Sequence, residues 1–391
     1  MVRSFSFNGK AISLFLLYLY AALPVVSTYG QIVLYITIPG AALLSYLSSR
    51  DKSQSKYMKL LLLLFIWIVF TSFFSYNIDV SFVWLRRVLA VYLLCLAVHQ
   101  IAKEDRYIPW VYLIWVIIYV TCLSYARDLI TTDQIDYTTN RVSDVNLNAN
   151  TLAYFTFFIT VIFFIWGNYD NKIGKFCRLL FFLTIPLSFY VALVTASRQV
   201  LIIQVPLILF LLYIRYLKGN RGIKVVLFVT LFFIFFFLFK SYIIQIYESS
   251  FLFQRSQMEV NEDARAALIR DGIKTGLNNF FTGVGIGCFG YYNYGHDTFA
   301  HNTYVELFST TGIVGFVIYV YMIISFIFIQ FKRYLQYRKK DYLVFAVIGL
   351  MYSLDNMFYV FHTDPWLMAF FILLTCHAES IHRKELNITI T

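Results

Sequence analysis

Long apolar runs separated by short polar connections make up most of this chain. The runs are about 17 to 25 residues long and lack strict two-residue alternation, which is typical of membrane-spanning helices and not of barrel strands. We therefore predict an all-α, polytopic membrane protein of about 12 transmembrane helices that forms a single domain over residues 1–391. The predicted spans are 11–27, 30–48, 60–76, 82–101, 108–126, 151–167, 179–196, 199–215, 224–246, 301–330, 342–361 and 365–380.

Composition excludes a water-soluble fold. The chain has 391 residues, of which 60% are hydrophobic and only 14% charged, so it has too little polar surface to cover a soluble protein. Arg3 and Lys10 precede the first apolar run as in a secretory signal, but no small-residue cleavage site follows, and we expect a retained helix. The five cysteines are scattered, which favours packing roles over disulfides or a zinc site.

The basic residues predict the orientation of the chain in the membrane. The formal net charge is +11, and 22 of the 32 lysines and arginines fall in the predicted connections on the side of the N-terminus. The positive-inside rule then gives an N-in, C-in topology. Because topology and anionic membrane lipid explain the charge, we expect no nucleic-acid partner.

Two sizeable loops are expected on the outer face, at residues 127–150 and 248–300. The second is too long to be a simple connector and is expected to contain structure of its own. Within it, Asn261 is a plausible N-cap, and Lys274 before Gly276 is typical of a helix C-terminus. A short amphipathic helix over the membrane surface is therefore predicted.

Arginine dominates the basic residues that are not on the inner side. Arginine binds phosphate oxygens in a bidentate manner, so this bias indicates a phosphate ligand on the outer face. Arg198 lies in a predicted hairpin at 197–199, since residues 179–215 are too long for one span. Arg198, Arg86 and Arg87 could each either hold a ligand or bind lipid headgroups. The ten lysines and arginines that fall outside the connections on the inner side are Arg86, Arg87, Arg127, Arg141, Arg198, Lys240, Arg255, Arg265, Arg270 and Lys274.

His301 opens an apolar run of about 30 residues, which is longer than the bilayer is thick. Its first turns should therefore stand above the hydrocarbon, where a neutral imidazole can accept a proton near pH 7. A structural role for this histidine remains open. Gly312 and Gly315, farther along the same run, are expected to let a neighbouring helix approach closely.

Two other patterns are rejected as cofactor sites. Residues 285–290 match G-x-G-x-x-G, but an external loop between membrane helices is not the βαβ context that dinucleotide binding needs. His296, Asp297 and His301 do not share a helical face, so no metal site is predicted. We expect the protein to need neither a metal nor another cofactor.

The order of several short motifs resembles the bacterial O-antigen ligase and polymerase family. The resemblance covers roughly residues 190 to 320, and each part would be weak alone. Its parts are Ala196-Ser-Arg198, Asp263-Ala-Arg265, Thr282-Gly-Val-Gly-Ile-Gly-Cys-Phe289, His301-Asn-Thr-Tyr304 and Thr311-Gly-Ile-Val-Gly315.

The resemblance implies metal-independent glycosyl transfer on the outer face, with a polyprenyl-pyrophosphate-linked oligosaccharide as donor. Arg198 and Arg265 would hold the pyrophosphate and stabilise its charge as it leaves, and His301 would orient or deprotonate the attacking sugar hydroxyl. The further candidates for substrate contact are Arg270, Asn302, Tyr304, Gly285, Gly287, Arg86 and Arg87.

The function predicted is that of a polymerase joining lipid-linked repeat units into O-antigen, capsule or exopolysaccharide. Its expected partners are the lipid-linked oligosaccharide, membrane lipid, a chain-length regulator and a flippase. Two alternatives remain: a ligase that transfers glycan to lipid A core, and a flippase or other transporter. A transporter should carry charge at mid-membrane, for which only Asp355 and Asp364 are candidates.

Overall fold

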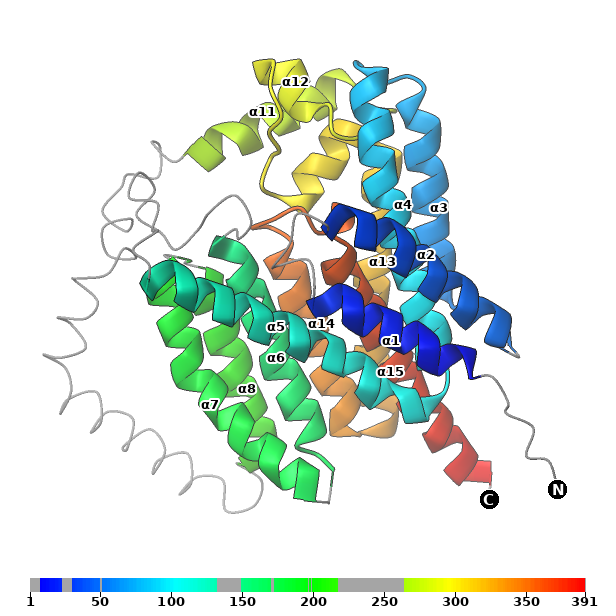
Figure 1. Cartoon of the computed structure of the whole chain (residues 1–391), viewed down its shortest axis with the longest axis vertical. Coiled ribbons are helices and arrows are strands. Elements are labelled where there is room, and N and C mark those ends of the chain that lie inside the picture. Colours follow the sequence, from blue (N-terminus) through cyan, green and yellow to red (C-terminus); the bar gives the residue numbers. More distant parts are fainter. Residues whose placement is uncertain are drawn as a thin grey trace, which may run out of the picture. The chain divides into compact units, whose positions relative to one another are not determined.

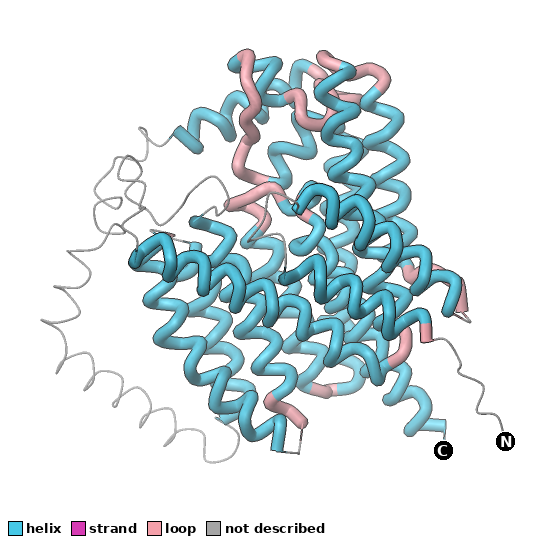
Figure 2. The backbone as a smooth tube through the Cα atoms, viewed as in Figure 1, coloured by secondary structure: helices cyan, strands magenta, loops and turns pink. Residues whose placement is uncertain are grey.

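The computed structural model describes residues 8–22, 30–49, 51–131, 149–169, 172–195, 197, 199–216 and 264–390. Within these ranges the secondary structure is helical and contains no strand, which confirms the all-α prediction (Figures 1 and 2). The elements are α1 Gly9–Ala22, α2 Gly30–Ser48, α3 Lys56–Ser72, α4 Ile78–Ala102, η1 Asp105–Tyr107, α5 Ile108–Thr131, α6 Ala149–Trp166, α7 Lys172–Thr195, η2 Val200–Gln204, α8 Val205–Tyr216, α11 Ala264–Asn278, α12 Phe289–Tyr294, α13 Thr303–Tyr337, α14 Lys340–Asp355, η4 Phe361–Thr363 and α15 Pro365–Ile390.

Several of these helices are long and apolar enough to cross a membrane. Four apolar segments in the described part are long enough to cross the bilayer, and shorter apolar helices accompany them. Each predicted span that falls on described residues overlaps a helix, but the span at 60–76 runs past the end of α3 at Ser72 and the span at 342–361 runs past the end of α14 at Asp355. The span at 224–246 lies outside the described residues. The chain is therefore a multi-pass membrane protein, while the number of twelve spans and the N-in, C-in topology stay predictions. The long segments are Ile78–Ala102, Asp105–Tyr125, Lys172–Ala192 and Thr303–Tyr337.

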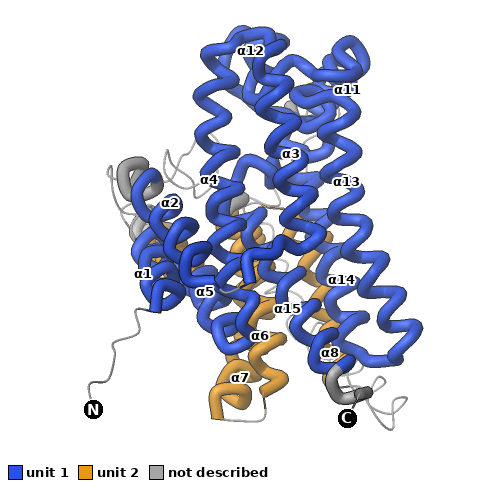
Figure 3. Tube along the Cα trace, turned by 90° about the vertical axis from the view of Figure 1, so that its right-hand side faces the viewer, with its two compact units in different colours: residues 1–117, 263–391 blue, residues 118–262 orange. Residues whose placement is uncertain are grey.

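Two compact units make up the chain (Figure 3). Unit 1 comprises residues 1–117 and 263–391, and unit 2 comprises residues 118–262. In unit 1, α4 packs against α2, α3 and α15, and α13 packs against α3, α11 and α14. The turn between α3 and α4 lies with α11 and α12 at one end of unit 1, here called the loop end (Figure 1).

Unit 2 confirms the predicted hairpin after residue 195. Ser188 Oγ of α7 donates a hydrogen bond of 2.9 Å to Gln204 Oε1 of η2. In one continuous helix these residues would be about 24 Å apart along the axis, so the chain must reverse between them. The five residues Val200–Gln204 form a π-helical turn directly after the reversal. Arg198 itself lies outside the described residues.

The long helix α13 breaks at Gly312. This residue has φ 67° and ψ −169°, and the break releases carbonyl groups that a continuous helix would bond. Other parts of the chain use them: Val284 N–H donates to the Ser309 carbonyl at 2.9 Å, and Gly285 N–H donates to the Thr310 carbonyl at 2.9 Å. The broken helix therefore holds the glycine run of residues 283–290 in place.

Gly315, one turn later, behaves as predicted. A Cβ added there would lie 3.2 Å from the ring of Trp67 on α3, so the absence of a side chain allows the two helices to approach. Gly312 was assigned the same role, but it contacts the backbone of Phe281 in the preceding loop instead.

The predicted helix end at Gly276 was wrong, because α11 continues to Asn278. Gly272 and Gly276 lie one turn apart on the face that packs against α13. Added Cβ atoms would lie 2.4 Å from Val305 and 2.3 Å from the ring of Phe308. These glycines therefore serve close helix packing within α11 and not termination.

Candidate active site

The glycine run is fixed against the start of α4. Tyr76 N–H donates to the Val284 carbonyl at 2.8 Å, and Ser81 Oγ donates to the Ile286 carbonyl at 3.0 Å. Residues 283–290 are buried, although the sequence places them in a loop. The run is therefore a rigid part of the loop end and not a mobile connector.

Gly287 brings this backbone against an aromatic side chain of α4. Its φ is 74°, and a Cβ at this position would lie 2.0 Å from Trp84 Cδ1. Only glycine combines this backbone conformation with such a close approach. The Trp84 ring in turn carries the Arg87 guanidinium, whose Cζ lies 4.4 Å from the ring centroid. The glycine run thus supports the wall that presents Arg87.

A cavity of about 300 Å³ opens beside this wall. Its size is at the lower end of the range for small-molecule sites. Apart from Arg87, its charged lining residues are Glu306 on α13 and Asp364 before α15. Its aromatic lining residues are Tyr20, Tyr35, Trp84, Phe299 and Tyr359. We call it the loop-end cavity.

Glu306 shapes one side of the loop-end cavity. It is 4% exposed, and its Oε2 accepts a hydrogen bond of 2.7 Å from the backbone N–H of Ala300. This bond fixes the segment 299–301 that precedes α13. Because a buried carboxylate is stable only with such partners, the glutamate and the loop hold each other in place.

His301 lies at the border of the loop-end cavity. Its φ is 54°, a left-handed conformation that costs a non-glycine residue about 1–2 kcal/mol. The imidazole packs over Phe299, with ring centroids 4.2 Å apart, and Phe299 lines the cavity. The next residue, Asn302, caps α13 by accepting hydrogen bonds from Tyr304 N–H at 3.0 Å and Val305 N–H at 3.1 Å.

Asp364 closes the opposite side. Its Oδ1 accepts hydrogen bonds from the N–H groups of Trp366 at 2.9 Å and Leu367 at 3.1 Å, so the carboxylate caps α15. Burial raises the pKa of Asp364 to about 6, although the two N–H groups act in the opposite direction. The charge in the cavity therefore changes within a physiologically accessible pH range.

Asp364→Asn should flatten the pH dependence of stability between about pH 4 and 6. The folded protein has the raised pKa and binds more protons than the unfolded chain in this window, so wild-type stability falls as pH rises through it. Thermal unfolding in detergent at several pH values measures the effect. Asn keeps the cap, so Asp364→Ala, which also lacks the titrating carboxyl, should be about 1 kcal/mol less stable than Asp364→Asn at every pH. An unchanged pH profile in Asp364→Asn would contradict the assignment.

The structure gathers some of the predicted site residues and separates others. Arg87 and Gly287 line the loop-end cavity, and His301 borders it. Arg86 is exposed on α4, and Gly285 is buried against Ser75.

Other candidates make internal contacts or lie elsewhere. The Tyr304 hydroxyl is hydrogen-bonded to Ser353, and Asn302 is the helix cap described above. Arg265 and Arg270 belong to α11 and are not among the residues that line the cavity; Arg270 is exposed. Arg265 lies about 10 Å along α11 from Gly272, which packs near Ala300. The substrate contacts assigned to all these residues stay predictions.

Sequence reasoning did not identify Glu306 or Trp84. A glutamate five residues after His301, at the start of an apolar run, was a usable signal because buried carboxylates need a reason to be there. Trp84 carried no such signal, since aromatic residues are common near membrane interfaces. Asp364 was noted only as a possible transporter residue.

Comparison with known families gives a match over part of the chain. Residues 183–320 match the family model described as O-antigen ligase. This stretch, less than half of the chain, is similar to an O-antigen ligase domain. The match confirms the resemblance drawn from residues 190 to 320, and it includes the glycine run, His301 and Glu306. A search among curated proteins gives no match.

Proposed function

We propose that the protein is a glycosyltransferase that joins polyprenyl-pyrophosphate-linked oligosaccharide repeat units on the outer face of the cytoplasmic membrane. The observation that carries this proposal is the chemistry of the loop-end cavity, to which the stretch that matches the O-antigen ligase family contributes Ile286, Gly287, Phe299 and Glu306.

The loop-end cavity suits a sugar ring better than a pyrophosphate. It presents two carboxyl groups, Glu306 and Asp364, but only one guanidinium, so it offers little positive charge to a pyrophosphate and can bind several hydroxyl groups. Its aromatic side chains offer flat apolar faces against which the C–H groups of a sugar can pack. The site therefore fits a sugar unit of one substrate.

His301 does not line the sugar site itself, but its ring packs on Phe299, which does, and we assign it the role of acting on a hydroxyl there. In the proposed reaction, its imidazole accepts the proton of the attacking hydroxyl while the sugar oxygen forms a bond to the anomeric carbon of the donor. The bond from that carbon to the pyrophosphate oxygen breaks, and the electron pair leaves with polyprenyl pyrophosphate. Arg265 and Arg198 would neutralise the charge that develops on this leaving group, which removes the need for a metal.

Glu306→Gln tests the sugar site. Gln retains an acceptor for the Ala300 N–H but removes the charge, so we expect folding to persist and the rate of glycosidic bond formation to fall about 10- to 100-fold. The measurement is product formation by purified protein with lipid-linked repeat units. Glu385→Gln, which removes a carboxylate paired with Lys339 away from this cavity, is the control. A wild-type rate in Glu306→Gln would contradict the site.

A ligase is the second candidate, because the matched family model carries that description. The two reactions share the same donor chemistry and differ in the acceptor. The glycan profile of a deletion strain separates them. Single repeat units on the acceptor indicate a polymerase, and loss of all attached glycan indicates a ligase. Lipid-linked units retained on the cytoplasmic side would indicate a transporter and overturn both.

A further inference from the structure

Arg87 is a charged residue inside a helix that is long and apolar enough to cross a membrane. It lies about 14 Å along α4 from Ile78, the first residue of the helix. An arginine at such a depth is energetically costly and nearly always faces a polar cavity or a partner of opposite charge. Arg87 is exposed and lines the loop-end cavity. A partner for its guanidinium is therefore expected in that cavity.

The described part of the chain provides no ionic partner for Arg87. Among the described residues its guanidinium forms no hydrogen bond or ion pair, and its contact is with the face of the Trp84 ring. An aromatic ring attracts the cation without using its five N–H donors. Trp84 is itself fixed by the close approach of Gly287. The guanidinium is thus held in place while its donors stay available to a ligand.

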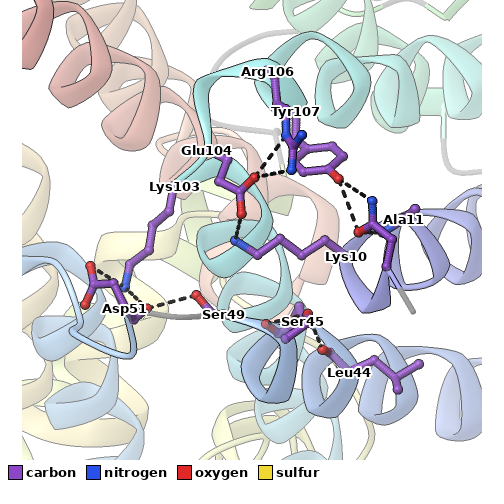
Figure 4. Close-up of polar contacts among 12 residues, drawn as sticks. Lys10, Ala11, Leu44, Ser45, Ser49, Asp51, Lys103, Glu104, Arg106 and Tyr107 are labelled. Carbon is purple, nitrogen blue, oxygen red and sulfur yellow. Dashed lines mark hydrogen bonds and ion pairs between the residues drawn. The ribbon is translucent and has the colours of Figure 1, made fainter. Parts of the chain in front are cut away.

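Basic residues at the other end of α4 are paired within the protein. Lys10 and Arg106 form ion pairs of 2.7 Å and 2.8 Å with Glu104, which follows the helix, as Figure 4 shows. Such a pair uses the donors of the cation and balances its charge. The described residues give Arg87 no such pair, and this difference favours a ligand-binding role for Arg87 over a structural one.

The two acids of the loop-end cavity do not neutralise Arg87. Glu306 accepts a hydrogen bond from the backbone of the preceding loop, and Asp364 accepts two from the first turn of α15. Neither carboxyl group forms an ion pair with Arg87. The three charged groups are therefore separate contacts around one cavity. This arrangement suits a ligand with a negative group at one end and hydroxyl groups elsewhere.

We propose that the loop-end cavity binds an acidic monosaccharide, whose carboxylate accepts two parallel hydrogen bonds from the Arg87 guanidinium. This inference rests on the proposed function, because the sugar is the unit of the lipid-linked substrate that occupies the cavity. Arginine matches a carboxylate in geometry, and one guanidinium balances the single charge of a uronic acid. Hydroxyl groups of the same ring can donate to Glu306 and Asp364, and its C–H face can pack on the aromatic lining. The substrate is then a repeat unit that contains a uronic acid.

Binding of simple glycosides to the full-length protein in detergent tests this inference. The probes are the methyl glycosides of glucuronic and galacturonic acid, each compared at equal ionic strength with the neutral glycoside of glucose or galactose. Ligand-observed NMR titration gives the dissociation constants. In one pair or both, the wild type should bind the acid about tenfold or more tightly, because the carboxylate adds a charge-assisted bidentate contact. Equal affinities in both pairs, or no binding by any probe, would overturn the inference.

Two neighbouring arginines of α4 locate the contact. Arg87→Gln should abolish the preference for the acid. Arg87→Lys should retain part of it, because lysine keeps the charge without the bidentate geometry, and it provides the test even where Arg87→Gln fails to fold. Arg86→Gln is the matched control: Arg86 is also exposed on α4 but does not line the cavity, so the preference should persist. A preference that survives in Arg87→Gln would show that another residue binds the carboxylate.

Inorganic pyrophosphate separates a sugar acid from the leaving group of the donor. Its affinity should be the same for Arg87→Gln and the wild type. Loss of pyrophosphate binding in this variant would assign Arg87 to the donor phosphate and overturn the acidic sugar.

The rate of product formation distinguishes this inference from the proposed function. Equal binding of acidic and neutral glycosides by a protein that forms product would refute the acidic sugar and leave the glycosyltransferase standing. Acid-selective binding by a protein that forms no glycosidic bond would refute the glycosyltransferase and leave the sugar site standing.

Discussion

His301→Ala should lower glycosidic bond formation by about 100-fold or more while the protein remains folded and inserted. General-base catalysis by a positioned side chain typically contributes about 10²–10⁴-fold. The backbone that positions His301 does not depend on its imidazole, because Glu306 holds the neighbouring Ala300 N–H and Asn302 caps α13. Removal of the ring therefore leaves the site assembled but without its base.

The measurement is polymer formation by purified protein, with polysaccharide length in cells as the second readout. His296→Ala is the matched control, because this histidine lies in the same loop, is exposed, and bonds the carbonyl of Tyr294. It should retain wild-type activity. Long-chain polysaccharide at normal expression of His301→Ala would show that the catalytic assignment is wrong.

Hydropathy was sufficient to place the helices. Burial in a bilayer requires long apolar runs, so the long apolar helices overlap the predicted spans, whereas the short helix α12 was not predicted. The hairpin near Arg198 followed from the same constraint of length, and the contact between Ser188 and Gln204 confirms it. These features depend on the local sequence alone.

The site depended on contacts that local sequence does not contain. Glu306, Asp364 and Trp84 come from three separate segments and meet only because α4, α13 and the turn before α15 pack together. A single sequence shows the residue types but not that these residues lie close together in the folded protein. His301 was identified because it begins an unusually long apolar run, which is a local signal.

Glycine was the residue most often misread. Gly276 was taken as a helix end from its position after Lys274, but it serves close packing against Phe308. Gly312 was taken as a packing position, but it breaks α13. A helix break and close helix packing both depend on the absence of a side chain. Only the backbone around the glycine determines which of the two roles it has.

Gly312→Ala should lower the unfolding free energy by about 3 kcal/mol or more and disrupt the active site. At φ 67° and ψ −169° the backbone lies in a region that is essentially restricted to glycine, which costs alanine about 1–3 kcal/mol. In addition, the new Cβ would lie 2.2 Å from the carbonyl oxygen of Phe281, and a backbone atom cannot move aside as a side chain can. Such overpacking adds about 1–3 kcal/mol.

The damage should extend to the loop-end cavity, because the break at Gly312 frees the carbonyls that hold Val284 and Gly285. Gly295→Ala is the matched control: its φ is 76°, but no atom lies within 4 Å of the added Cβ. It should cost only the conformational term of about 1–2 kcal/mol and leave activity intact. Thermal unfolding in detergent and product formation measure both effects. Equal destabilisation by the two variants would mean that the close contact with Phe281 is absent, and the link from the helix break to the glycine run would fail with it.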